Sequence, residues 1–142
     1  MKASEVQRLV DAARAARKNA YAPYSGYRVG ASVLTAGGGL YAGSNVENAT
    51  YGATLCAERS AIAAMIAVGE RHPIACAVVA SGPRPAAPCG ICRQVLAEFA
   101  IGMPLFLIAE DEDGKVVRRT RLSLRTLLPH AFRFRPPKAA SG

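Results

Sequence analysis

Hydrophobic and polar positions follow two different periods in the first third of this chain. Residues 4–19 carry apolar side chains at the three- and four-residue spacing of an amphipathic helix, namely Val6, Leu9, Val10 and Ala13. Ser4 and Gln7 form the pattern of a capping box at the start of that helix. Residues 27–35 alternate instead, which predicts a strand, and a glycine-rich turn then leads to a returning strand over 40–44.

The rest of the chain predicts a sheet with helices on both of its faces. Two continuous apolar runs, at 74–80 and 105–109, are typical of strands that are buried on both sides, as in a parallel sheet. The remaining predicted elements are one strand and three helices, at 115–120, 56–68, 89–100 and 124–128. The order α-β-β-α-β-α-β-β-α predicts an α/β fold, a single three-layer α/β/α domain around a mixed five-stranded sheet.

Length and composition fit one ordinary globular domain. The chain has 142 residues, of which 51% are hydrophobic and 20% are charged. We expect the domain to occupy residues 1–135, followed by a disordered C-terminal tail at 136–142. No apolar run approaches the roughly 18–20 residues of a membrane span, and the N-terminus lacks the apolar core of a signal peptide. These features predict a cytoplasmic protein without a membrane partner.

The net charge of +8 raises the question of a nucleic-acid partner. Much of the basic excess lies in the first predicted helix and near the C-terminus, and no single run interleaves basic with aromatic side chains. This distribution favours a basic solvated surface, so a nucleic-acid partner is not expected.

Three of the four cysteines have the spacing of metal ligands. Cytoplasmic thiols stay reduced, so cysteines in such a protein indicate metal binding or catalysis rather than disulfides. Cys89 and Cys92 stand three apart at the start of one predicted helix, and Cys56 opens another. Three thiolates can hold a zinc ion and leave its fourth position open to water, which permits hydrolytic chemistry. Cys76 lies in an apolar run and is interpreted as a buried core thiol.

Glu58 follows Cys56 by two residues, where it can move protons without ligating the metal. A C-x-E pattern with a downstream P-C-x-x-C resembles the signature of zinc nucleobase deaminases, with Cys56 where other members have histidine. Two helix N-termini, together with Arg59 and Arg93, are expected to offset the negative charge of the three thiolates. The alternative is a closed zinc site in a non-catalytic binding module, with its fourth ligand supplied by Cys76, His72 or His130.

Five segments together resemble the small zinc-dependent cytidine deaminases of pyrimidine salvage. They are Y-A-P-Y-S at 21–25, N-V-E-N-A at 45–49, C-A-E-R at 56–59, P-C-G-I-C-R-Q at 88–94, and L-L-P at 127–129 followed by Phe132. The resemblance spans residues 21–132. It implies hydrolytic deamination of cytidine and 2′-deoxycytidine to uridine and 2′-deoxyuridine, with release of ammonia.

The resemblance also implies a role for each matching residue. One zinc ion per subunit would be held by Cys56, Cys89 and Cys92, and Glu58 would be the catalytic proton carrier. The nucleoside would contact five residues: Asn45 and Glu47 at the ribose hydroxyls, Ala57 through its backbone, Tyr27 where the family usually has phenylalanine, and Phe132. The last of these would reach a neighbouring subunit, since the family forms homotetramers with shared active sites.

The residues themselves leave other interpretations open. Asn45 and Glu47 also suit plain turn positions, Tyr27 also suits a strand core, and Phe132 also suits packing within its own chain. The substrate also remains open at this point, because a nucleoside antibiotic or a base within RNA or DNA presents similar chemistry.

Overall fold

The computed structural model describes residues 1–134, and its core is a five-stranded sheet in the order β2-β1-β3-β4-β5. The strands are β1 (Val29–Thr35), β2 (Leu40–Ser44), β3 (Pro73–Ser81), β4 (Pro104–Glu110) and β5 (Val116–Ser123). Only β3 and β4 pair in parallel, and the other neighbours are antiparallel. The predicted mixed sheet is therefore confirmed, whereas the predicted tail at 136–142 lies outside the described residues.

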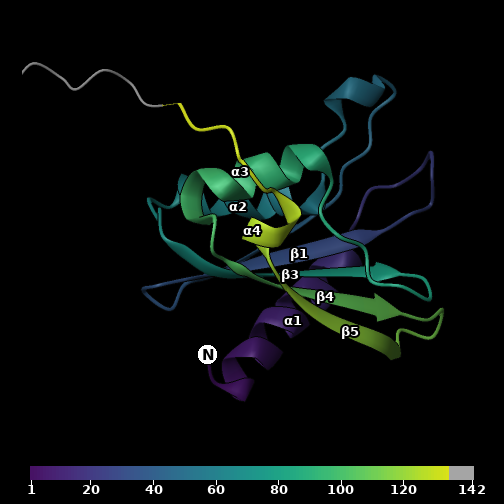
Figure 1. Ribbon diagram of the computed structural model, residues 1–142. Coiled ribbons are helices and arrows are strands. Elements are labelled where there is room, and N and C mark those ends of the chain that lie inside the picture. Colours follow the sequence, from purple (N-terminus) through teal and green to yellow (C-terminus); the bar gives the residue numbers. More distant parts are fainter. Residues whose placement is uncertain (135–142) are drawn as a thin grey trace, which may run out of the picture.

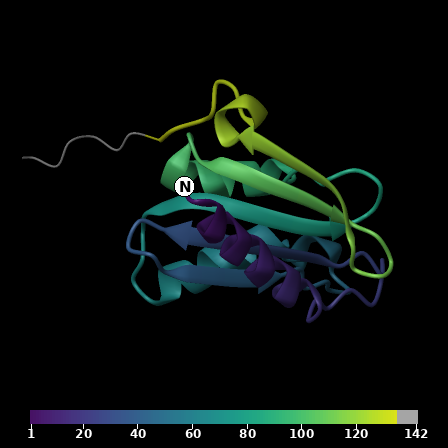
Figure 2. The same cartoon turned by 90° about the horizontal axis from the view of Figure 1, so that it is seen from below.

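Helices cover both faces of this sheet (Figures 1 and 2). Helix α1 (Ala3–Arg17) packs on one face, and α2 (Ala57–Ala67) and α3 (Gly90–Ala100) pack on the other. A short helix α4 (Leu124–Leu127) follows β5, and a 3₁₀ turn spans Tyr51–Ala53. This arrangement confirms the three-layer prediction.

Strand β3 supplies side chains to both layers of the core. Ala75, Ala77 and Val79 pack toward α1, while Cys76 and Val78 pack toward α2 and α3. Successive side chains of a strand point to opposite faces, so a strand covered on both faces must be apolar at nearly every position. This explains the continuous apolar run in the sequence and confirms Cys76 as a buried core thiol.

The start of α1 differs from the prediction. The helix begins at Ala3, and the Glu5 carboxylate accepts a hydrogen bond of 2.8 Å from the backbone N–H of Lys2. Ser4 lies inside the helix, and the Gln7 amide donates to Asp11 instead of reaching back. The predicted Ser4–Gln7 capping box is therefore wrong, because the N-cap is Lys2, two residues before Ser4, and Glu5 provides the reciprocal bond.

Strand β1, by contrast, begins later than predicted, at Val29 rather than at residue 27. The carbonyl of Tyr27 and the N–H of Val29 both bond the side chain of Asn45. These bonds replace strand pairing at this point, so Tyr27 belongs to the segment that precedes the sheet.

A close backbone approach fixes α2 on the sheet. A Cβ atom added to Gly43 would lie 2.4 Å from the Cβ atom of Ser60, so only glycine fits at this position of β2. The Ser60 hydroxyl donates to the carbonyl of Ser44 over 3.0 Å. Both contacts hold the first turns of α2 against β2.

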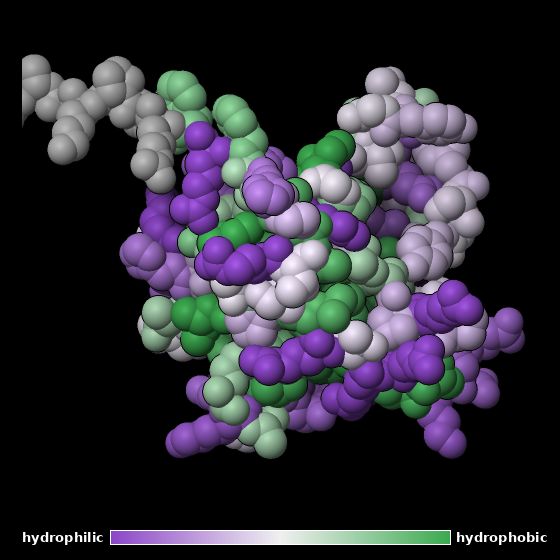
Figure 3. Space-filling view, in the orientation of Figure 1, coloured by the Kyte–Doolittle hydropathy of each residue, from purple (hydrophilic) through white to green (hydrophobic). Residues whose placement is uncertain are grey.

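The hydrophilic surface gathers where α1 and β5 lie on the face drawn in Figure 3. On the edge strand β5, Arg118, Arg119 and Arg121 are exposed. Charged side chains on an edge strand discourage pairing with a second sheet. Within residues 1–134, no helix combines the length and the apolar character needed to cross a membrane.

Candidate metal centre and active site

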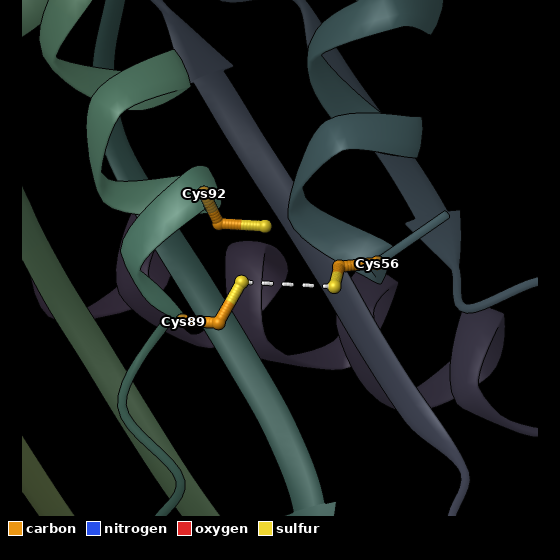
Figure 4. Close-up of side chains that lie close together, drawn as sticks. All are labelled: Cys56, Cys89 and Cys92. Carbon is orange, nitrogen blue, oxygen red and sulfur yellow. Dashed lines mark hydrogen bonds between the residues drawn. The ribbon is translucent and has the colours of Figure 1, made fainter. Parts of the chain in front are cut away.

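Two helix starts bring the three predicted ligands together. Cys56 is the N-cap of α2, Cys89 is the N-cap of α3, and Cys92 lies in the first turn of α3. Their sulfur atoms all lie within 4.8 Å of one another and point to a common centre (Figure 4). Each N-cap position places its cysteine at the positive end of a helix dipole, which favours thiolates.

The sulfur geometry fits a zinc ion. The Sγ atoms of Cys56 and Cys89 are 3.8 Å apart. Zn–S bonds of about 2.3 Å in a tetrahedron place two sulfur atoms about 3.8 Å apart. Since three soft thiolate donors also suit zinc, the site fits this metal in both geometry and chemistry.

Charges and hydrogen bonds stabilise the thiolate form of Cys56, which favours binding of a cation. Hydrogen bonding from Cys92, assisted by Arg59 and Cys89 and opposed by burial, lowers the pKa of Cys56 to about 5. One Arg59 guanidinium nitrogen, Nη2, lies 3.6 Å from the Cys56 sulfur and also donates to the carbonyl of Thr54 over 3.0 Å. Hydrogen bonding with Cys56, together with burial and the nearby charge of Glu58, raises the pKa of Cys92.

Arg93, which was predicted to offset the thiolate charge, bonds two backbone carbonyl groups. Its Nε donates to the carbonyl of Pro88 over 2.7 Å, and its Nη1 donates to the carbonyl of Leu127 over 2.9 Å. Both hydrogen bonds tie the start of α3 to α4 and to the loop before Cys89. Arg93 therefore braces the ligand loop through carbonyl groups, while Arg59 is the arginine that contacts a sulfur atom.

Glu58 lies directly after the α2 N-terminus and is almost fully buried, with 5% of its surface exposed. Burial raises the pKa of its carboxyl, and the nearby charge of Cys56 raises it as well. Within the described residues, the group able to hold a metal contains the three cysteines and not Glu58. The carboxyl of Glu58 is therefore outside the set of metal ligands.

A closed four-ligand site has no support in the described part of the chain. The candidates for a fourth ligand were Cys76, His72 and His130, and none of them joins the metal-ligand group. The Cys76 thiol is fully buried within the sheet and faces the carbonyl of Ala77 at 3.7 Å. The arrangement thus offers three protein ligands and one adjacent carboxyl.

Asn45 is mostly buried, and its side chain organises the start of β1. Its Oδ1 accepts from the N–H of Val29 over 2.9 Å, and its Nδ2 donates to the carbonyl of Tyr27 over 2.8 Å. One hydrogen of Nδ2 has no partner in these two bonds. The side chain is therefore held rigidly and keeps one donor for another group.

Glu47 holds the loop that precedes this segment. Its Oε1 accepts from the N–H groups of Tyr24 and Ser25 over 2.9 and 3.1 Å, and its Oε2 accepts from the Ser25 hydroxyl. These bonds, led by the one from the Ser25 side chain, lower the pKa of Glu47 and keep it ionised. Ser25 was not among the predicted site residues, and its place in the Y-A-P-Y-S segment was the available signal for this contact.

The other three residues predicted to contact the nucleoside, Ala57, Tyr27 and Phe132, differ in how far they are buried. Ala57 is fully buried at the start of α2, directly between Cys56 and Glu58. Tyr27 is 43% exposed and so is not part of a strand core, and the Glu58 charge contributes to its raised pKa, behind desolvation. Phe132 is 73% exposed and contacts α3 through its carbonyl, which accepts from Gln94 over 3.2 Å. Burial of Phe132 within its own chain is therefore not observed.

The α/β/α fold, the three-thiolate centre and the buried carboxyl together define a zinc-dependent hydrolytic enzyme. Residues 3–107 match the family model described as the cytidine and deoxycytidylate deaminase zinc-binding region. The chain belongs to this deaminase family, and its cofactor is zinc.

Relatives of known name support the same family. A cytidine deaminase of Sporosarcina psychrophila is 43% identical over 129 residues, which cover 90% of this chain and 91% of the relative. The crystal structure of cytidine deaminase from Burkholderia pseudomallei is similar with a TM-score of 0.79 and 44% identity, covering 93% of this chain and 100% of that one. The crystal structure of cytidine deaminase from Mycobacterium tuberculosis has a TM-score of 0.74 and 36% identity, with coverages of 91% and 98%.

Proposed function

We propose that this protein catalyses the hydrolytic deamination of cytidine and 2′-deoxycytidine to uridine and 2′-deoxyuridine, with release of ammonia, in pyrimidine salvage. The observation that carries this proposal is a buried glutamate, Glu58, beside three convergent cysteines in a chain of the deaminase family. The three relatives described above each cover at least 90% of this chain, and all of them bear the name cytidine deaminase.

The reaction exchanges an amino group for oxygen at C4 of the base. Cys56, Cys89 and Cys92 would hold the zinc ion, and the chemistry that it would supply there is an activated water for this attack. Glu58 accepts a proton as the C–O bond forms and delivers it to N3 of the ring. A second proton passes through Glu58 to the amino nitrogen, which leaves as ammonia when the C–N bond breaks. Because burial raises the pKa of Glu58, its carboxyl approaches the range in which it can both accept and release protons near neutral pH.

Nucleoside binding is assigned to the segment around Asn45. The free hydrogen on Asn45 Nδ2 can donate to a sugar hydroxyl, and the ionised carboxylate of Glu47 can accept from one. Such a donor–acceptor pair suits ribose, and a substrate without the hydroxyl would leave the buried amide of Asn45 without this partner. Tyr27 would pack against the nucleoside, and the backbone of Ala57 would contact the base.

We also propose a homotetramer in which Phe132 reaches a neighbouring subunit's active site. The support is the exposure of large apolar side chains in one chain, including Phe132 at 73% and Tyr51 at 77%. Mixing two inactive variants tests this assignment. A Phe132→Ala subunit retains Glu58, and a Glu58→Gln subunit retains Phe132, so mixed tetramers should recover activity. Absence of recovery after verified subunit exchange would contradict shared sites.

Two further assignments accompany this proposal. The reduced thiols that the metal centre requires support a cytoplasmic location. The catalytic domain would occupy residues 1–135.

The direct test is the ultraviolet absorbance of cytidine incubated with zinc-loaded protein. Conversion to uridine changes the spectrum, and the Glu58→Gln variant is the matched control. A change that depends on Glu58 supports the reaction. If zinc-replete protein leaves cytidine unchanged, the proposed substrate is wrong, and the same assay should then be run with single-stranded oligonucleotides.

A further inference from the structure

Residues 27–29, which lead into β1, are held by side chains from two distant elements. Asn45 bonds the carbonyl of Tyr27 and the N–H of Val29. The intervening carbonyl, that of Arg28, accepts a hydrogen bond of 3.0 Å from Nε of Arg17 at the end of α1. Three consecutive residues are thus fixed by two side chains, one at the end of α1 and the other directly after β2.

Arg17 is itself held by a buried carboxylate. Its Nη1 lies 3.1 Å from Oε2 of Glu110, the last residue of β4, which is only 3% exposed. A buried carboxylate needs charged or hydrogen-bonding partners, and Glu110 has two guanidinium groups, those of Arg14 and Arg17. Because the guanidinium is a planar fork, Arg17 can bond Glu110 and the Arg28 carbonyl at the same time.

The ion pair lies close to the segment that carries Tyr27. Tyr27 and Glu110 line the same cavity of about 670 Å³, together with residues at and after the end of β3, two acidic residues of the turn after β4 and one residue of β5. The charge of Arg17 also acts on the Tyr27 hydroxyl, since it lowers the pKa of Tyr27 against the larger effect of desolvation. A displacement of Arg17 would therefore change the electrostatic environment of the Tyr27 hydroxyl.

We infer that Arg17 and Glu110 are positioning residues for substrate binding, which act by fixing the backbone that carries Tyr27. This inference rests on the proposed function, in which Tyr27 packs against the nucleoside. Neither residue contacts the three cysteines, and so the zinc centre should be unaffected. Small displacements of a positioning group weaken substrate binding steeply.

Arg14 provides a matched control. It also pairs with Glu110, but its second bond, of 2.7 Å, goes to the carbonyl of Gly114 in the turn between β4 and β5. Replacing either arginine with glutamine removes one partner of Glu110. Only the Arg17 variant also releases residues 27–29.

The experiment compares Arg17→Gln, Arg17→Lys and Arg14→Gln in the zinc-loaded full chain. For Arg17→Gln we expect KM for cytidine to rise about tenfold with little change in kcat, and amide hydrogen exchange at Val29 to become faster. Arg14→Gln should lower the melting temperature similarly but leave KM and the exchange at Val29 unchanged. Arg17→Lys keeps the charge but has no planar fork, so an intermediate KM is expected, and this variant replaces Arg17→Gln if that protein does not fold.

KM for cytidine and amide exchange at Val29 together distinguish failure of the positioning role from failure of the proposed function. Equal KM values for the Arg17 and Arg14 variants, in a protein that deaminates cytidine, would refute the positioning role. Unchanged exchange at Val29 in the Arg17 variants would refute it as well. If the parent protein does not deaminate cytidine, the proposed function fails, whereas the exchange measurement still decides whether Arg17 holds residues 27–29.

Discussion

Replacing Glu58 with glutamine tests the catalytic assignment at a single carboxyl group. Glutamine has nearly the same volume as glutamate, and the side chain is only 5% exposed, so packing at the start of α2 should be kept. The amide cannot accept and release a proton as the carboxyl does. The substitution therefore removes proton transfer while it leaves the three cysteines in place.

The expected loss follows from the number of proton transfers assigned to Glu58. One positioned general acid or base contributes about 10²–10⁴-fold, and Glu58 serves as both base and acid in the proposed reaction. We therefore expect kcat to fall by at least about 10³-fold, or roughly 4 kcal/mol in activation free energy. Zinc stoichiometry should remain at one per chain, because Glu58 is outside the metal-ligand group.

The assay combines the absorbance change of cytidine with a metal analysis of the same protein sample. A Glu58→Gln variant that keeps its zinc and turns over within about tenfold of the parent would refute the proton-carrier role. Loss of zinc from this variant would instead show that Glu58 supports the metal, and the assignment of three ligands would need revision.

Three further predictions concern the metal centre and the helix that carries it. Cys89→Ala should abolish stoichiometric zinc binding, since two thiolates remain, and full occupancy by elemental analysis would exclude Cys89 as a ligand. Cys76→Ala should keep zinc and activity and cost about 1 kcal/mol in unfolding free energy, measured with denaturant, whereas zinc loss would contradict its place in the core. Gly43→Ala should cost about 3 kcal/mol, because its Cβ would meet Ser60 at 2.4 Å. Gly52→Ala, with open space around it, should stay within about 0.5 kcal/mol, and equal losses in the two glycine variants would refute the steric argument.

Local patterns in the sequence determined the elements and the chemistry of the site. The period of apolar residues is a local property, and it placed every α-helix and strand of residues 1–134 to within a few residues, but not the 3₁₀ turn Tyr51–Ala53. The zinc ligands were also predictable, because Cys89 and Cys92 form a short motif and Cys56 with Glu58 forms another. Such motifs work because a helix start fixes the relative directions of nearby side chains regardless of the rest of the fold.

Only the tertiary structure decided which distant groups meet. Cys56 and Cys89 are 33 positions apart in the sequence, but their sulfur atoms are 3.8 Å apart in the structure. Arg17 and Glu110 are separated by 93 positions, and no periodicity pairs a basic residue on a helix with the last residue of a strand. The sequence predicted that Arg93 offsets the thiolate charge, and only the folded chain brings its side chain to the carbonyl groups of Pro88 and Leu127.

Asn45 shows, within one residue, both what the sequence predicts and what only the tertiary structure decides. The sequence placed it in a polar connection and, through a family resemblance, beside a sugar. The structure adds that Asn45 ends strand pairing at Val29 by taking over two backbone groups. A hydrogen-bonding side chain can satisfy many partners, and the choice among them is made by which backbone groups the folded chain leaves unpaired nearby. Sequence therefore specified the reactive groups, and packing specified how each of them is held.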